Sequence, residues 1–262
     1  MLAISHLAPD TRATINCLFA DIDDTITSDG KLTAEAYAAM WRWQAAGNRM
    51  IPITGRPAGW CDHIARMWPV DAVVGENGAF YFIHDDVKGR LVQRFLFDAE
   101  TREHNRQRMQ MIRDQILVEV PGTAVASDQN YREADLAIDF CEDVPPLDDE
   151  AIDQIVSIMQ AGGMTAKVSS IHVNGWFGDY DKLSMTRLLM SEQFDVDLDQ
   201  QKHQYVFVGD SPNDAPMFGY FPNSVGVANL QEMIARVAQR PAYITLNKAG
   251  AGFAELIDHL LG

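Results

Sequence analysis

The stretch 15-INCLFADIDDT-25 decides the fold, because it joins a short apolar run directly to three aspartates, Asp21, Asp23 and Asp24. Each pair of like charges 4 Å apart repels by about 1 kcal/mol in water, and by about 4 kcal/mol at an effective dielectric constant of 20. In extended backbone, residues two apart point to the same side. We therefore expect Asp21, Asp23 and Thr25 to face one site. Asp24 should face away from it.

Further short apolar runs predict that the first one is a strand of a buried parallel sheet. Each ends in a turn or cap residue, and helical patterns at 33–47 and 57–68 separate the first ones. The predicted strands are 15–20, 49–54, 72–75, 204–209 and 224–228. Strands and helices that alternate in this way indicate right-handed crossovers. The expected fold class is therefore α/β, with a doubly wound parallel sheet.

The middle of the chain interrupts this alternation. A β-hairpin is expected over 78–97 with its turn near Lys88, followed by a polar helix over 99–116. Alternating stretches at 135–140 and 164–174 enclose a further helix over 148–163. We expect a core formed by 1–97 and 178–262, and an inserted α+β cap formed by 98–177.

Composition limits the classes of partner. The chain has 262 residues and a formal net charge of −16, which argues against a nucleic acid or an anionic membrane surface as partner. Its three cysteines share no CxxC spacing, which is typical of reduced thiols in a cytoplasmic protein. No signal peptide and no apolar run of about 18 residues is visible. A monomer and a homodimer both stay open.

A second acidic cluster follows the predicted strand 204–209. In 209-GDSPND-214, Asp210 and Asp214 frame a turn that also contains Asn213. Ligands of doubly wound sheets bind beyond the carboxyl ends of the strands, so this cluster and Asp21 should converge on one cavity. Carboxylates forced together either share a proton or bind a hard cation. Oxygen ligands of this kind suit Mg²⁺.

Two other elements supply groups for an anion. The strand 49–54 ends in 53-ITGRP-57, which offers the Thr54 hydroxyl, backbone N–H groups near Gly55, and Arg56. Lys182 starts a helical pattern after 178-GDYD-181 and could provide the cation that the net charge lacks. Taken singly, each of these features is usually only a turn, a cap or a solvated side chain, and their combination in this order is what indicates a site.

These residues resemble the four motifs of the haloacid dehalogenase-like superfamily of phosphotransferases: 21-DIDDT-25, Thr54, Lys182 and 209-GDSPND-214. Two other segments, 75-GENGAFYF-82 and 244–261, resemble its Cof-like branch. An α+β insertion between the second and third motifs is similar to the large cap of its sugar-phosphatase members. The position held by Asp24 is often glycine in this branch.

The resemblance implies a role for each matching residue. Asp21 would attack phosphorus and Asp23 would act as the general acid and base. The implied phosphate-binding groups are Thr54, Gly55, Lys182 and Asn213. The implied Mg²⁺ ligands are Asp21, Asp23 through its backbone carbonyl, Asp210 and Asp214.

The cap should select the leaving group. His172 and Asn174 share one strand face in 171-IHVNGWFGDYDK-182, and Trp176 would join them if the strand continued. A sugar suits this mixture of polar edges and an aromatic platform, although a plain surface strand fits equally well. Arg132 could grip an anion, but a solvated loop is the expected setting. Arg56, Asn77, His172 and Asn174 are the predicted substrate contacts.

The expected function is Mg²⁺-dependent hydrolysis of a small phosphorylated metabolite, above all a sugar phosphate, through an aspartyl phosphate. A phosphosugar mutase using the same chemistry is the alternative, since water access decides between the two. A non-catalytic receiver domain is disfavoured, because such domains are about half this length and lack an acid/base group two residues from the phosphorylated aspartate.

Overall fold

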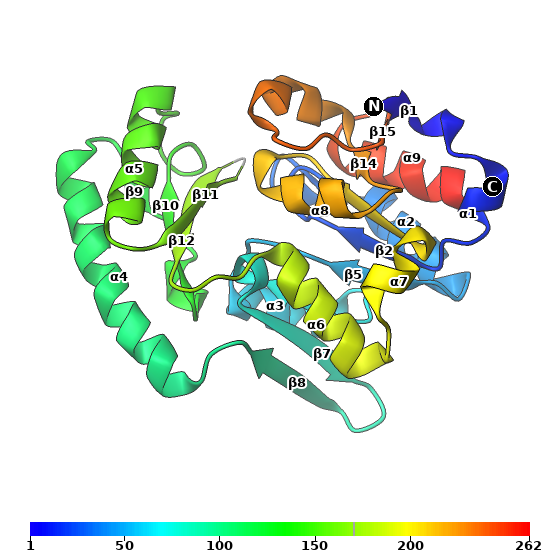
Figure 1. Cartoon of the computed structure of the whole chain (residues 1–262), viewed down its shortest axis with the longest axis horizontal. Helices are drawn as coiled ribbons and strands as arrows, with labels where there is room; N and C mark the ends of the chain where they lie inside the picture. The colour runs from blue at the N-terminus through cyan, green and yellow to red at the C-terminus, as the bar shows by residue number, and fades with distance from the viewer. Residues whose placement is uncertain (170) are drawn as a thin grey trace.

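The computed structural model describes residues 1–169 and 171–262 and has a parallel sheet of six strands at its centre (Figure 1). All five pairings between neighbouring strands are parallel. In spatial order the strands are β1 (Leu2–Ala3), β15 (Tyr243–Ile244), β14 (Val225–Gly226), β13 (Tyr205–Gly209), β2 (Cys17–Ala20) and β5 (Arg49–Pro52). The predicted α/β fold with a parallel sheet is confirmed.

Burial on both faces explains why the central strands are continuous apolar runs. On one face, Leu18 and Val206 pack in a core shared with helices α2 (Ala34–Ala45) and α9 (Ala249–Leu261). On the other face, Phe19 and Phe207 pack with helices α6 (Lys182–Phe194) and α8 (Ala215–Tyr220). Helix α3 (Ala58–Met67) joins the first core. The short helices α1 (Pro9–Arg12) and α7 (Leu198–Gln201) complete the α-helices of the core.

The register of β2 against β13 places the two acidic clusters side by side. Ala20 pairs with Val208, and the backbone N–H of Asp21 donates to the Val208 carbonyl. Each strand therefore ends at the same edge of the sheet, immediately before an aspartate. This edge carries the site described below.

Antiparallel strands flank the core. The hairpin of β7 (Phe80–Asp85) and β8 (Arg90–Phe95) lies within the predicted range, and β3 (Thr27–Ser28) pairs with β4 (Lys31–Leu32). The prediction that 72–75 is a parallel strand is wrong in part. Strand β6 (Val73–Gly75) pairs antiparallel with β7, and one parallel bridge links Ile53 to Val74.

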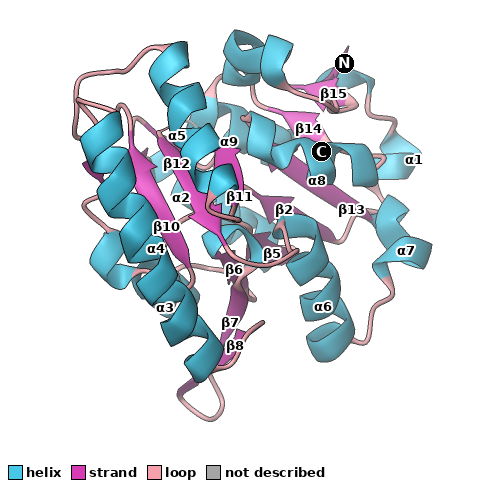
Figure 2. Cartoon of the chain, turned by 60° about the vertical axis from the view of Figure 1, so that its left-hand side comes forward, coloured by secondary structure: helices cyan, strands magenta, loops and turns pink. Residues whose placement is uncertain are grey.

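The cap is a four-stranded antiparallel sheet with two helices packed on one face. Its strands, in spatial order, are β11 (Thr165–Val168), β12 (His172–Trp176), β10 (Asp135–Asp139) and β9 (Ala124–Val125). Figure 2, turned so that the cap comes forward, shows β10 and β12 side by side. The predicted single stretch 164–174 is two strands, and Ser170, which falls between them, lies outside the described residues.

Side chains along the cap strands point alternately to the cap helices and to the core domain. Leu136, Ile138 and Val173 pack against helices α4 (Ala99–Glu119) and α5 (Asp149–Ala161), which form the outer layer of the cap (Figure 1). The intervening side chains of β10 and β12, including Asp135 and Asn174, are also buried and lie on the opposite face. That face meets the edge of the parallel sheet. None of the described helices is both long and apolar enough to cross a membrane.

Candidate active site

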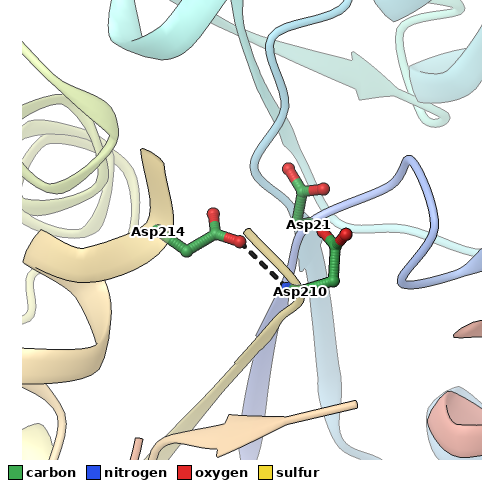
Figure 3. Close-up of side chains that lie close together, drawn as sticks. All are labelled: Asp21, Asp210 and Asp214. Atoms are coloured by element: carbon green, nitrogen blue, oxygen red, sulfur yellow. Dashed lines mark hydrogen bonds between the residues drawn. The ribbon is translucent and has the colours of Figure 1, made fainter. Parts of the chain in front are cut away.

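Three buried carboxylates meet where β2 and β13 end. Oxygen atoms of Asp21, Asp210 and Asp214 lie within 4.8 Å of one another, and Figure 3 shows how the three side chains lie together. The backbone N–H of Asp210 donates to Asp214 Oδ2 over 3.1 Å, which fixes the turn between them. The structure therefore brings together the two acidic clusters that the sequence places 189 residues apart.

Lys182 bridges two of these carboxylates. Its Nζ atom donates to Asp21 Oδ1 over 2.5 Å and to Asp214 Oδ1 over 2.7 Å. Lys182 is the first residue of α6, which begins with a capping box between Asp181 and Ser184. The capping box at the N-terminus of α6 thus positions the ammonium group of Lys182 beside the acidic cluster.

The charges of this cluster do not balance. Three carboxylates and one ammonium leave two negative charges in a buried place. Burial raises the pKa of Asp21 to about 8, with Asp214 and Asp23 adding to the effect and Lys182 opposing it. Burial and the neighbouring carboxylates also raise the pKa of Asp210. Burial alone would lower the pKa of Lys182, but its two partners outweigh burial and the ammonium stays charged.

This donor set fits a divalent cation. Mg²⁺ prefers carboxylate and carbonyl oxygens and is commonly held by one or two carboxylates together with substrate phosphate. Two positive charges would balance the excess on Asp21, Asp210 and Asp214. Asn229 supports the arrangement, because its Nδ2 atom donates to the Asp24 carbonyl over 2.9 Å and lies 3.4 Å from Asp210 Oδ2.

Asp23 does not point at the other carboxylates. The Arg56 guanidinium holds it, with Nε 2.9 Å from Asp23 Oδ1 and 3.0 Å from Oδ2. The Arg56 guanidinium also lies over the Trp60 ring, 4.4 Å from its centroid. Asp23 is therefore placed beside the cluster, with its side chain turned toward the second motif.

The extended backbone from which we expected Asp21, Asp23 and Thr25 to face one site does not continue, because the chain turns after Ile22. Asp24 has φ +53°, which breaks the extended alternation. Thr25 does reach the cluster, and its hydroxyl donates to Asp210 Oδ1 over 3.2 Å. The Asp24 charge contributes to the raised pKa of Asp210, after burial and two nearer aspartates, so Asp24 is not remote from the site.

The predicted phosphate-binding residues surround this edge. Thr54 is fully buried, and its hydroxyl accepts the backbone N–H of Arg56 over 3.0 Å. Gly55 and Asn213 line a cavity with Asp21, and Asn213 Oδ1 accepts from the Ser211 hydroxyl. Asn77 packs against Gly55 rather than lining that cavity. Among the described residues, its buried Nδ2 atom has no hydrogen-bond partner.

The cavity lies between the core and the cap and has a volume of about 20 Å³. The predicted substrate residues Arg56, His172 and Asn174 all line it, together with Asp23 and Arg132. It has room for about one water molecule. In this arrangement of core and cap the cavity is therefore too small for a metabolite.

Two expectations about the cap are wrong. Arg132 is not in a solvated loop: it is buried and pairs with Asp128 and Asp135, each over 2.9 Å. Trp176 is not an open platform. Its ring stacks on Tyr180 in the hydrophobic core, and its Nε1 atom donates to the Tyr180 carbonyl. The aromatic part of the predicted sugar site is therefore absent from the cavity wall.

Several contributors have no motif in the sequence. Glu142 Oε1 accepts from Arg56 over 2.9 Å, and its Oε2 atom lies 2.9 Å from His172 Nε2. Hydrogen bonding to His172 and the charge of Arg56 lower the pKa of Glu142 to about 2, despite partial burial. Asn229 follows the strand β14, so the rule that ligands gather at strand ends could have indicated it.

Glu76 links the core to the cap. Its buried carboxylate accepts the backbone N–H groups of Ala58 in the core and of Glu133, Ala134 and Asp135 in the cap, over 2.6 to 3.2 Å. Burial and the Asp135 charge raise its pKa to about 8.

Comparison with known proteins agrees with this architecture. Residues 18–131 match the family profile described as haloacid dehalogenase-like hydrolase. No curated protein sequence matches the chain.

Solved structures share the fold across nearly the whole chain. A protein of Thermoplasma acidophilum has a TM-score of 0.70 at 18% identity, with 94% of this chain and 98% of that chain covered. A HAD/COF-like hydrolase of Plasmodium vivax has a TM-score of 0.66 at 17% identity, with 95% and 96% covered. The sucrose-phosphatase of Synechocystis, solved with sucrose and phosphate, has a TM-score of 0.64 at 16% identity, with 93% and 97% covered. The matched profile confirms the predicted resemblance to the haloacid dehalogenase-like hydrolases, and the solved structures share the overall fold.

Proposed function

We propose that the protein is a Mg²⁺-dependent phosphatase that hydrolyses a small phosphorylated metabolite, a sugar phosphate, through an aspartyl phosphate on Asp21. The observation that carries the proposal is the buried cluster of Asp21, Lys182, Asp210 and Asp214, which has two excess negative charges beside a further carboxylate, Asp23. The solved sucrose-phosphatase with the same fold supports a sugar as the leaving group.

In the first step, an Asp21 oxygen attacks phosphorus and the bond from phosphorus to the leaving oxygen breaks. Asp23, in its protonated form, gives its proton to that oxygen, so the sugar leaves as an alcohol. In the second step, Asp23 takes a proton from water, and the water oxygen attacks phosphorus. The bond to Asp21 breaks, which releases phosphate and restores the carboxylate.

Lys182 stabilises charge on the transferred group. Phosphoryl transfer depends mainly on positioning and electrostatic stabilisation. Lys182 already lies 2.5 Å from the attacking carboxylate, so it would lie near the oxygens of a phosphoryl group bound to Asp21. Backbone N–H groups near Gly55, together with Thr54 and Asn213, complete the proposed phosphate contacts.

The proposed ligands of Mg²⁺ are Asp21, Asp210, Asp214 and the backbone carbonyl of Asp23. When bound, the ion would offset the repulsion between the nucleophile and the incoming phosphate. The chain's other proposed properties follow from its composition: a small-molecule partner rather than nucleic acid or membrane, and a cytoplasmic location suggested by three cysteines that share no CxxC spacing.

The test is phosphate release from a panel of sugar phosphates, with and without Mg²⁺. We expect Asp21→Asn to abolish turnover and Asp23→Asn to lower kcat by about 10²- to 10⁴-fold, the usual range for a lost general acid. Activity that persists in Asp21→Asn, or that is indifferent to EDTA, would refute the mechanism. Phosphorus NMR of the products separates the mutase alternative, which would give an isomerised sugar phosphate and little free phosphate.

A further inference from the structure

Carboxylates surround the two arginines in the wall of the catalytic cavity. Arg56 is 4% exposed and pairs with three of them: Asp23 over 2.8 Å, Glu142 over 2.9 Å and Asp128 over 3.3 Å. Two of the three, Asp128 and Glu142, come from the cap. The positive charge of Arg56 is thus already satisfied when the cavity is closed.

The second arginine of the wall is satisfied in the same way. Arg132 is 6% exposed, and it pairs with Asp128 and Asp135 on the cap. One of its Nη atoms also donates to the Gly55 carbonyl over 2.9 Å, so its remaining capacity is directed at the core backbone. Neither arginine therefore presents an unpaired charge to a ligand.

The formal charges of this group can be summed. Two guanidinium groups pair with four carboxylates, so this group carries about two negative formal charges, most of them just behind the cavity wall. The group comprises Arg56, Arg132, Asp23, Asp128, Asp135 and Glu142. If Asp135 holds a proton, because its pKa is raised by burial, one negative charge remains; if Asp23 is protonated as well, as the first chemical step requires, the group is neutral and still offers no unpaired cation. The cluster of Asp21, Asp210 and Asp214 supplies no positive charge to offset this sum, since it carries an excess of negative charge itself.

We propose that this wall selects substrates whose leaving group is uncharged and polyhydroxylated, and that Glu142 enforces the selection against a second anionic group. This inference rests on the proposed phosphatase function and narrows its substrate class. A carboxylate or second phosphate beside Arg56 would have to displace a cap carboxylate or lie next to it. Displacement takes Glu142 away from Arg56 and His172, and an anion that lies next to Glu142 is repelled by its charge; both are unfavourable.

Hydroxyl groups meet no such penalty. They donate to carboxylates and accept from amide and imidazole N–H groups, and both kinds of partner line the cavity or lie directly behind it. Asn174, His172 and Ser169 line the cavity from the cap. Glu142 is held behind His172 by the contact of 2.9 Å between Oε2 and Nε2.

Two matched pairs of substrates test the proposal. Glycerol 3-phosphate and 3-phosphoglycerate differ by a hydroxymethyl group against a carboxylate, as do sorbitol 6-phosphate and 6-phosphogluconate. For the wild-type protein we expect kcat/KM to favour the neutral member of the better pair by about tenfold or more, which corresponds to 1.4 kcal/mol. Equal rates, or a preference for the acid, would overturn the inference and would indicate that Glu142 only holds the place of a substrate anion.

Glu142→Gln keeps the shape of the side chain and removes its charge. We expect the preference for the neutral member to fall by about threefold or more, on the scale of a changed charge pair. The ratio is taken within one variant, so a general loss of activity cancels. Glu150→Gln, at an exposed position of α5, is the matched control and should leave the ratio unchanged.

An unchanged ratio in Glu142→Gln would refute the role of Glu142, and the wild-type ratio tests the charge argument even if the variant does not fold. Failure of the proposed phosphatase function would give a different result. If no phosphate monoester is hydrolysed, including p-nitrophenyl phosphate with Mg²⁺, then the proposed phosphatase function falls and the inference falls with it.

Discussion

Asp24 shows how one backbone angle reorganises a motif. Its φ of +53° lies in the left-handed region, which costs a non-glycine residue about 1–2 kcal/mol and costs glycine little. The conformation turns the chain so that the Thr25 hydroxyl reaches Asp210. It also directs the Asp24 carbonyl to Asn229. The frequent glycine at this position in similar proteins has a physical reason: the turn, rather than the side chain, is what the site requires.

Asn229→Ala should weaken the response to Mg²⁺ more than it weakens folding. Asn229 connects the first motif, Asp210 and the backbone N–H of Ala249, and partners of this kind typically affect metal affinity by about 10- to 100-fold. We expect the Mg²⁺ concentration for half-maximal activity to rise by about tenfold. Calorimetric titration of Mg²⁺ supplies a readout that is independent of turnover.

Asn247→Ala, which alters a polar residue of the neighbouring loop, is the control for Asn229→Ala. It should leave the Mg²⁺ response as in the wild type, because its side chain bonds to Glu255 and not to the acidic cluster. If the Asn229→Ala variant binds Mg²⁺ as tightly as the wild-type protein does, Asn229 plays no part in the proposed metal site.

Among single residues, the sequence predicted those that lie at the end of a strand or at the start of a helix. Asp21 and Asp210 follow buried strands, and Lys182 opens a helix, so strand ends and helix starts located them. Glu142 and Asp128 were not predicted, because they reach Arg56 only through the docking of the cap on the core. No local pattern encodes a contact between segments that are 72 and 86 residues apart.

Helix α6 illustrates positioning at the scale of an element. Its first turn lies directly against Gly78, where an added Cβ atom would be 2.1 Å from the Asp181 carbonyl oxygen. Gly78 has φ +109° and follows Glu76 and Asn77, two non-glycine residues that also have positive φ. This tight segment therefore sets where α6 begins, and hence where Lys182 enters the site.

Gly78→Ala should disrupt both folding and activity. The Cβ atom would collide with backbone, which cannot yield as a flexible side chain can, so we expect the free energy of unfolding to fall by about 3 kcal/mol or more. Urea unfolding measures this loss. Gly89→Ala is the matched control, since Gly89 also has positive φ, +60°, but nothing lies within 4 Å of its added Cβ.

We expect Gly89→Ala to cost only the backbone strain of a left-handed alanine, about 1–2 kcal/mol, and to leave turnover intact. Equal losses in the two variants would show that strain at positive φ, rather than contact with α6, explains the effect of Gly78→Ala.

The elements themselves were predictable where burial is simple. Apolar runs bounded by turn residues located the central strands, because a parallel sheet is covered on both faces. The division of 164–174 into β11 and β12 was missed, although two consecutive polar residues, Ser169 and Ser170, interrupt the alternation and could have indicated it. Strand β6 was taken as parallel because its length and composition match the neighbouring strands, whereas its pairing depends on the hairpin that follows.

At the scale of the whole molecule, buried carboxylates make stability depend on pH. Asp21 and Glu76 have pKa values raised to about 8 by burial, whereas unfolded carboxyl groups release their protons near pH 4. Between these values the folded protein binds more protons than the unfolded chain. Raising the pH through this window therefore favours unfolding.

We expect the metal-free protein to lose stability as pH rises from about 5 to 8, by up to about 1.4 kcal/mol per pH unit for each proton retained on folding. The Tm increase on adding Mg²⁺ should be larger at pH 8 than at pH 5, because the ion binds the deprotonated cluster. Thermal unfolding at both values, with EDTA or Mg²⁺, measures this. A metal-free Tm that rises with pH would contradict it.

The two passages of the chain between core and cap lie against each other. The rings of Phe97 and Tyr180 are 6.1 Å apart at their centroids, and an added Cβ on Gly178 would meet Phe97 at 2.9 Å. A segment of some 80 residues thus leaves and re-enters the core at nearly one point. Such an insertion is separable: a short turn could close the gap at little entropic cost. Caps of other selectivity could be grafted onto this core at the same pair of junctions.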